Sequence, residues 1–539
     1  MERNIESSKV RAKENKMGLY GAISYIIGNI VGSGLFIAPR SILISSKTVG
    51  MALVIWAVSA IISVLGSFCY VELGTSIRQS GCDFAYLCYA RWYSLAFAFM
   101  IVGCVLVYPA TVAIQAETFA EYVMYGFNIS LCSSTASYFA KKLISFSLIW
   151  ILLFLNFFSL EKLVSKFQIA ASIAKVVSTA IVIGTGFYFL VFKGETQYLA
   201  HPFANGDYDA GSLCAALFAG LFTYDGWDIL NYGMEEIKNP KKTMPLAIVI
   251  GMTLVAVIFL ATNISYFTVL DIRQIEESDA IASTFAKERL GDFQYIVPFL
   301  ICILLIGSIN SSIFSASRYL YAAARVGHLP SFISCTNYVN DSPRAAVFVN
   351  AILSMALAFA GDLKSLMEYV GFAMWLQRAV TLIVLLWIRF GRKPVHPEAV
   401  RTPIFIPIIF FIICAALTIT TIAQNIAISS IGLVVLAIGY IAYFLFIYER
   451  WLIYFPNLLR LRHSVNHYST VFVQIVFDTV PELAAPDDIN TSINCKSSLS
   501  DGSSVSVASA SSAVQKLNKK SKWFPFRRRV TGKGEKISS

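Results

Sequence analysis

The sequence predicts an all-α membrane protein with about twelve transmembrane helices. Hydrophobic residues make up 57% of the 539-residue chain, and only 14% of the residues are charged, against about 25% in a typical soluble domain. The apolar residues form long runs spread over residues 17–454. Because a soluble protein of this size could not bury so much apolar surface, the composition excludes a soluble enzyme.

The expected helices begin after a short polar segment. Residues 1–16 are polar, and we expect a cytoplasmic N-terminal segment, because the apolar run that follows is too long for a signal sequence. A run of about 20 apolar residues can cross the hydrocarbon core as a helix. The runs predicted to do so are 17–43, 50–77, 89–125, 139–159, 165–192, 210–235, 243–270, 292–326, 344–361, 363–390, 403–425 and 428–454.

The placement of lysine and arginine predicts the orientation, since both are enriched in cytoplasmic loops. With a cytoplasmic N-terminus, most basic residues fall on the cytoplasmic side. They are Lys9, Arg11, Lys13, Lys16, Lys162, Lys166, Lys238, Lys241, Lys242, Arg389, Arg392, Lys393 and Arg401. We therefore expect a multi-pass protein with both termini in the cytoplasm.

The C-terminal segment, 455–539, differs from the apolar domain of residues 17–454. Residues 491–515 contain ten serines and no aromatic residue, so they cannot form a core and are expected to be disordered. A basic cluster at 519–529 surrounds three aromatic residues. It is interpreted either as a site that docks on anionic lipid or as a solvated basic end.

Several other functions have no support in the sequence. The net charge of +11 comes without a nucleic-acid-binding motif, so no nucleic-acid partner is expected. No Walker motif indicates ATP-driven transport. The five histidines are scattered without metal-ligand spacing. No arrangement of a nucleophile and a base predicts an enzyme, and neither a metal nor a cofactor is expected.

Two glycine-containing stretches interrupt predicted membrane helices. They are GNIVGSG at 28–34, in the first helix, and GLFTYDGWD at 220–228, in the sixth. Glycine accepts unusual backbone angles, so both helices can unwind and free backbone groups to bind an ammonium or a carboxylate. Interrupted helices at matching positions of two halves indicate a transporter site near the bilayer midplane. The alternative is that Gly28 and Gly32 only permit close helix packing.

Three charged residues lie deep inside predicted membrane helices. Asp225 and Asp228 lie in the second interrupted stretch, where an unpaired carboxylate would be costly. Lys175 lies ten residues into the run that starts at Ser165, about 15 Å from its end. Its ammonium is therefore expected to pair with carbonyls or a carboxylate, in a site or in a structural ion pair.

Short motifs throughout residues 17–454 then indicate a family. They are IVGSGLF at 30–36, YVELG at 70–74, SGCDFAY at 80–86, LFTYDGW at 221–227, LNY at 230–232, SRY at 317–319 and GHLP at 327–330. The sequence resembles the amino acid–polyamine–organocation superfamily and, within it, the light chains of heteromeric amino-acid transporters. The resemblance implies sodium-independent amino-acid exchange by alternating access. It also implies an inverted five-plus-five (LeuT-like) helix repeat with broken helices 1 and 6.

The resemblance also assigns roles to individual residues. Backbone N–H groups of the first break would bind the substrate carboxylate, and carbonyls of both breaks would bind its amino group. Phe222 would be the aromatic gate, and Lys175 would stand where sodium-coupled relatives bind Na⁺. The residues implied to bind substrate are Ile30, Ser33, Gly34, Phe222, Asp225, Gly226 and Trp375.

Cys132 is expected in an outer loop between the third and fourth helices. Unpaired outer cysteines suggest intermolecular disulfides. The resemblance implies that Cys132 bonds to a single-span glycoprotein heavy chain in the plasma membrane, whereas the alternative is a free thiol.

Two charged residues bear on selectivity. Relatives that carry cationic amino acids have aspartate at the position of Asp225, so we expect the protein to carry cationic as well as large neutral amino acids. Arg378, three residues after Trp375, departs from the family pattern. If it pairs with Asp225 or Asp228, the pocket would accept neutral substrates only.

Two rival functions remain at this point. One is a proton- or sodium-coupled carrier of the same fold that needs no heavy chain, which Lys175 and Cys132 disfavour. The other is a nutrient receptor that does not transport, which the intact glycine breaks and Phe222 disfavour.

Overall fold

The computed structural model describes residues 17–481 except for 79–80, 130–132, 158–160, 205, 207, 233, 235–236, 279, 326, 338–341, 362, 425 and 449–455. Several sequence predictions therefore lie outside the described residues. These are the N-terminal segment 1–16, Cys132, the serine-rich stretch 491–515 and the basic cluster 519–529.

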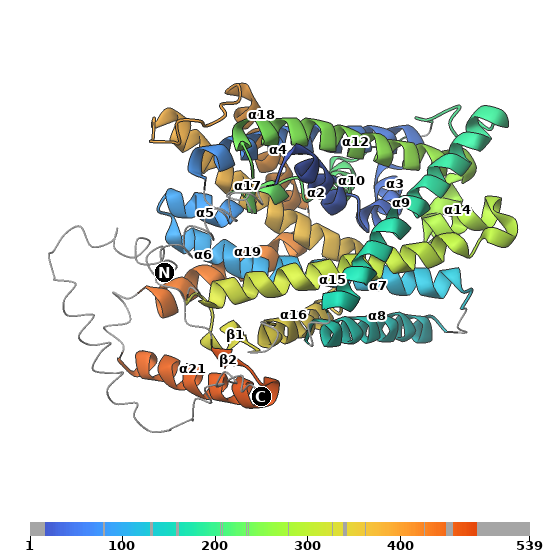
Figure 1. Ribbon diagram of the computed structural model, residues 1–539. Helices are drawn as coiled ribbons and strands as arrows, with labels where there is room; N and C mark the ends of the chain where they lie inside the picture. Colours follow the sequence, from blue (N-terminus) through green and yellow to red (C-terminus); the bar gives the residue numbers. More distant parts are fainter. Residues whose placement is uncertain are drawn as a thin grey trace, which may run out of the picture. The chain divides into compact units, whose positions relative to one another are not determined.

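The described chain is helical almost throughout (Figure 1). Its first half contains α2 (Leu19–Ile30), α3 (Gly34–Ser46), α4 (Val49–Ile77), α5 (Cys82–Tyr89), α6 (Tyr93–Val102), the π-helix η1 (Gly103–Val107), α7 (Tyr108–Gly126), α8 (Ser134–Phe157), α9 (Glu161–Phe192), α10 (Ala210–Thr223) and α11 (Ile229–Tyr232). Its second half contains α12 (Pro240–Val269), α13 (Ile272–Glu277), α14 (Ile281–Arg289), η3 (Gly291–Phe293), α15 (Ile296–Arg325), η4 (Ser331–Ser334), β1 (Cys335–Thr336), α16 (Arg344–Leu357), α17 (Leu363–Phe390), α18 (Phe405–Gln424), α19 (Ile426–Ala442), η5 (Tyr443–Ile447), α21 (Pro456–Phe477) and β2 (Val480–Pro481).

The helices have the lengths that a membrane protein requires. Among the described residues, 9 helices are long and apolar enough to cross a bilayer, and α2 and α3 together form one further span bent by 51°. Two of the predicted runs give shorter apolar helices, α10 and α16. The run 210–235 is interrupted after Thr223, and helix α16 ends at Leu357, before residue 361. The protein is thus a multi-pass helical membrane protein.

The chain beyond the last predicted span contains a further helix, α21, within the segment 455–539. Its last turn lies against the main helices: Arg344 Nη1 donates to the Phe477 carbonyl over 2.6 Å, and the Phe477 ring contacts Phe157 and Phe348. Strand β2 pairs antiparallel with β1. These contacts place residues 456–481 against the ends of α8 and α16.

A buried carboxylate joins three parts of the chain. Glu72 of α4 is 2% exposed, and its two oxygens accept hydrogen bonds from the Arg389 guanidinium of α17. The Thr402 N–H and hydroxyl, just before α18, also donate to Glu72 Oε2, over 3.0 and 2.5 Å. Because every donor is supplied by the protein, the cost of burying this charge is offset. The ends of α4 and α17 and the start of α18 are therefore fastened together.

Helices α9 and α12 approach so closely that one glycine is required at their contact. A Cβ atom at Gly186 would lie 2.2 Å from Ser265 Cβ and 2.5 Å from Ser265 Cα, and nothing lies within 4 Å of a Cβ atom at Gly184. The two glycines thus lie on different faces of α9. One face meets α12, and the other is open.

We therefore predict that Gly186→Ala destabilises the protein by about 1–3 kcal/mol, because the added methyl group must push α12 backbone away. Gly184→Ala is the matched control on the same helix and should leave stability unchanged within about 0.5 kcal/mol. Thermal unfolding of the purified variants in detergent measures both. Equal melting temperatures for the two variants would contradict the close contact.

Candidate functional site

A cavity of about 720 Å³ lies between the two interrupted helices. Its wall includes both breaks, together with residues of α7, α9, α15 and α17. Gly81, Asp83 and Phe84, from the chain between α4 and α6, also line it. Phe222, another lining residue, packs against an apolar cluster that includes Ile37 and Val370. Phe222 therefore stands between the cavity and this cluster.

The first break exposes the N-terminus of α3 to the cavity. Helix α2 ends at Ile30 and α3 begins at Gly34, with Ser33 in the N-cap position. All three residues, which the resemblance implied to bind substrate, line the cavity. The first N–H groups of a helix have no partner within it and carry partial positive charge. This end of the cavity can therefore bind a carboxylate.

The second break supplies the opposite polarity. Helix α10 ends at Thr223, and Gly226, with φ at 100°, turns the chain before α11 begins at Ile229. Phe222, Asp225 and Gly226 line the cavity. The last carbonyls of a helix carry partial negative charge, so this end can bind an ammonium group. The two ends together match the charges of an amino acid.

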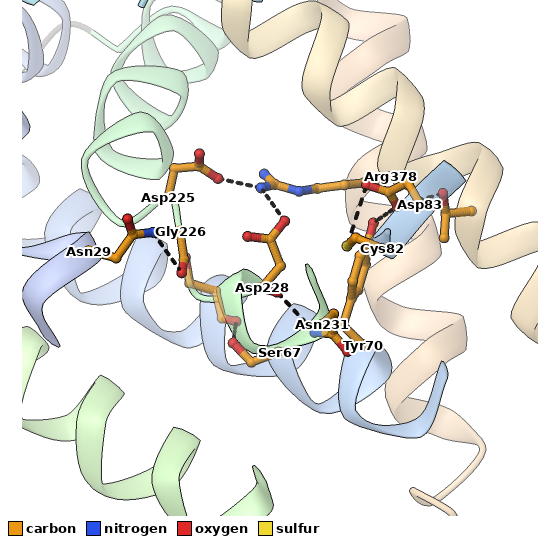
Figure 2. A network of polar contacts seen from close by, with 12 residues as sticks. Asn29, Ser67, Tyr70, Cys82, Asp83, Asp225, Gly226, Asp228, Asn231 and Arg378 are labelled. Carbon is orange, nitrogen blue, oxygen red and sulfur yellow. Dashed lines mark hydrogen bonds and ion pairs between the residues drawn. The ribbon is translucent and has the colours of Figure 1, made fainter. Parts of the chain in front are cut away.

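A hydrogen bond connects the two breaks directly. Asn29 Nδ2 donates to the Gly226 carbonyl over 3.2 Å, as Figure 2 shows. A Cβ atom at Gly226 would lie 2.2 Å from Asn29 Nδ2. A side chain at position 226 would thus both force an unfavourable φ and displace the bond.

Arg378 lies between the two aspartates of the second break (Figure 2). Its guanidinium forms an ion pair with Asp225, and its Nη2 is 3.8 Å from Asp228 Oδ2. The guanidinium carbon lies 4.7 Å from the Trp227 ring centroid and 4.9 Å from that of Trp375. Arg378 is only 3% exposed, so this is a buried cation held by charges and by two aromatic rings.

Trp375, which the resemblance implied to bind substrate, lies beside the cavity, behind Arg378. Its side chain is 2% exposed and is not among the residues that line the cavity. It packs instead against Phe410 of α18, with ring centroids 5.8 Å apart. The Arg378 guanidinium lies against the Trp375 ring and itself lines the cavity. Trp375 therefore contacts Arg378 on the side away from the cavity.

Lys175 of α9 reaches the first break from the side. Its Nζ donates to the Gly28 carbonyl over 3.0 Å, and it lines the cavity. The carbonyl pairing that the sequence left open as one alternative is the one observed. The ammonium ties α9 to the last turn of α2.

The sequence matches a model of the amino acid permease family over residues 17–459. This match covers most of the chain. The protein belongs to the amino acid permease family.

Curated relatives agree with this assignment. The chain is 49% identical to Amino acid transporter protein 6 of Caenorhabditis elegans, over 89% of this chain and 92% of that protein. It is 33% identical to the human Cystine/glutamate transporter over 88% and 92% of the two chains. It is 34% identical to the mouse b(0,+)-type amino acid transporter 1 over 87% and 94%. The family resemblance that the motifs indicated is confirmed.

The permease cavity also contains residues that the sequence analysis did not select. One face of α15 contributes four serines, Ser308, Ser311, Ser312 and Ser315. Their spacing places them on one face of a helix, and a polar stripe in an apolar span was a usable signal. Ser312 Oγ donates to Gln115 Oε1 of α7 over 3.0 Å. The cavity wall between α7 and α15 is thus polar.

Asp83 is a second residue that was not selected as a site residue. It follows Gly81 and Cys82, which both have positive φ, at 116° and 51°. Its Oδ1 accepts hydrogen bonds from the hydroxyls of Tyr70 and, over 2.8 Å, Thr381. Asp83 lies within the SGCDFAY motif, but nothing in the local sequence shows that it meets α17.

Proposed function

We propose that this protein exchanges amino acids across the plasma membrane without sodium, as the light subunit of a disulfide-linked heterodimer. The observation that carries the proposal is the cavity between the two helix breaks. Its N–H-rich and carbonyl-rich ends suit the carboxylate and ammonium groups that all amino acids share. Membership of the amino acid permease family and relatives that are named as amino-acid transporters support the same function.

We propose a twelve-helix topology with both termini cytoplasmic and two inverted repeats of five helices. In this assignment, the bent pair α2 and α3 is the first helix and the interrupted pair α10 and α11 is the sixth. Each would be the first helix of one repeat, as broken helices are in some transporters with inverted repeats. Phe222 is the aromatic gate of the cavity in this assignment.

Counterflow in proteoliposomes tests the proposal. Vesicles loaded with unlabelled leucine should accumulate labelled leucine, and unloaded vesicles should not. Labelled arginine and glutamate extend the assay to the other substrate classes. Binding without any counterflow would favour a receptor, and uptake that requires an ion gradient would favour a coupled carrier.

The role proposed for Lys175 gives a prediction about coupling. Its ammonium binds the Gly28 carbonyl, where it would take the place of a coupling Na⁺. Replacing Na⁺ with choline should leave exchange unchanged. Lys175→Ala should reduce exchange at least about tenfold, because it removes the ammonium that bonds to the Gly28 carbonyl, and a hydrogen bond to a charged group contributes about 1.5–3 kcal/mol.

Lys193→Ala is the matched control for this experiment, because Lys193 lies just beyond the end of α9 and outside the cavity. It should exchange leucine like the wild type. Full activity in Lys175→Ala, or a requirement for Na⁺ in the wild type, would exclude the proposed role.

The Arg378–Asp225 ion pair leads us to propose neutral substrates. A cationic side chain would have to displace a guanidinium that already occupies the carboxylate. This favours the neutral-only alternative over the cationic uptake expected from Asp225 alone.

Arg378→Ala should therefore allow arginine uptake, with a gain of about tenfold to hundredfold, since a charge-assisted hydrogen bond contributes about 1.5–3 kcal/mol. Leucine uptake is the internal reference. The double variant with Asp225→Asn should lose the gain. Efficient arginine uptake by the wild type would refute the neutral-only assignment.

The heavy-chain link is proposed from Cys132. In cells that also make a heavy chain, the wild type should run on non-reducing gels as a high-mass band that reductant removes. Cys132→Ser should abolish this band, because no other thiol replaces it at that position. Cys88→Ser, at the partly exposed Cys88, is the control and should keep the band. A wild type that runs as a monomer without reductant would refute the link.

A further inference from the structure

Three carboxylates and one guanidinium lie together in the cavity wall (Figure 2). Arg378 pairs with Asp225, and its Nη2 is 3.8 Å from Asp228 Oδ2. A carboxylate oxygen of Asp83 and one of Asp228 lie, with Cys82 Sγ, within 4.8 Å of one another. With all three carboxylates ionised, the guanidinium would balance only one of them. Two ionised carboxylates this close in a buried site repel strongly, which favours keeping one of them protonated.

The hydrogen bonds around Asp83 and Asp228 distinguish the two carboxylates. Asp83 Oδ1 accepts from two hydroxyl groups, of Tyr70 and Thr381, and these donors stabilise its ionised form. The Asp228 side chain is only 10% exposed, yet its oxygens accept no hydrogen bond from another described residue. A buried carboxylate with fewer donors from its surroundings is the costlier one to ionise. This difference favours the proton on Asp228.

The other titratable groups around the pair do not alter this charge balance. The Cys82 thiol is fully buried. Lys175 is occupied by the Gly28 carbonyl, and the Arg318 guanidinium lies 3.3 Å from the Phe314 ring centroid. Neither of these cations forms an ion pair with a carboxylate in the described part of the chain. Three tyrosines, neutral near pH 7, complete the surroundings: Tyr86, Tyr108 and Tyr232.

We propose that Asp228 is a proton-binding site, and that the ammonium group of the substrate displaces its proton. This inference rests on the proposed function for the nature of the substrate. Asp228 lines the cavity and follows the C-terminal end of α10 by five residues. The partial negative charge of that helix end attracts the ammonium group to the same place. A positive charge beside Asp228 favours its ionised form, so its O–H bond breaks and the proton leaves to cavity water.

The exchange of a proton for an ammonium group couples amino-acid binding to pH. By reciprocity, a substrate that expels a proton binds more tightly when the proton is scarce. For an exchanger that does not return empty, the coupling appears as a pH dependence of amino-acid affinity and not as net proton transport.

The test counts protons released when leucine binds to the purified full-length protein. Calorimetric titrations near pH 7, in two buffers with different ionisation heats, give the number directly. The wild type should release a substantial fraction of one proton per leucine, and its affinity should rise up to about tenfold per pH unit below the pKa of the site. Asp228→Asn, which resembles the protonated acid, should release none and bind leucine independently of pH.

Glu398→Gln is the control, because Glu398 is a carboxylate that is 62% exposed and lies outside the cavity. Proton release should persist in this variant. Equal release by the wild type and Asp228→Asn would overturn the proposal, as would leucine binding by the wild type without release. If Asp228→Asn does not fold, the wild-type titrations alone decide.

An infrared measurement separates this inference from the proposed function, because it needs no substrate. The wild type at about pH 6 should show a carboxylic-acid C=O band that Asp228→Asn lacks. Absence of that band in the wild type overturns the proton site. A wild type that shows the band but binds no amino acid would contradict the proposed function and leave the proton site standing.

Discussion

The site exists because backbone polar groups inside a membrane must find partners. A continuous helix pairs its own N–H and carbonyl groups, and hydrocarbon offers no water to replace them. Breaking α2 from α3 and α10 from α11 leaves such groups open in the interior. The protein supplies partners for some of them: Asn29 bonds to the Gly226 carbonyl, and Lys175 bonds to that of Gly28. The backbone N–H and carbonyl groups that remain unpaired face the cavity. The carboxylate and ammonium groups of an amino acid can form hydrogen bonds with them.

Buried charge is the second constraint, and it is met in two different ways. Glu72 is surrounded by donors and serves as a structural anchor. The cluster of Asp83, Asp225 and Asp228 has a single guanidinium for three carboxylates. Excess acid in a closed structure would only reduce stability. Beside a cavity, the same excess of negative charge can be compensated by a cationic group that enters the cavity.

The sequence predicted the features that depend on local composition and missed those that depend on distant contacts. Long apolar runs predicted the positions of the helices. The two glycine-containing stretches predicted both helix breaks, which include or adjoin Ser33, Gly34 and Phe222. The resemblance implied Trp375 among the substrate-binding residues, but residue spacing along α17 does not reveal that its ring packs between Arg378 and Phe410 of α18. The meeting of Asp83 with Asp228 joins segments far apart in the chain, and no local pattern encodes it. The sequence showed that Arg378 departs from the family pattern and offered Asp225 or Asp228 as its partner. It could not show that Asp225 is the one that forms the direct ion pair.

The fastening around Glu72 has a mechanical consequence. A carboxylate that accepts hydrogen bonds from a guanidinium, a backbone N–H and a hydroxyl cannot leave one of these donors without losing bonds that offset its burial. We therefore expect the ends of α4 and α17 and the start of α18 to move together as one unit. Arg378 lies about three turns before Arg389 on the same helix, so this unit would carry the Arg378 guanidinium with it. A tilt of this unit would change the distance between Arg378 and Asp225. The electrostatic interactions within the carboxylate cluster would then depend on the conformation of the carrier.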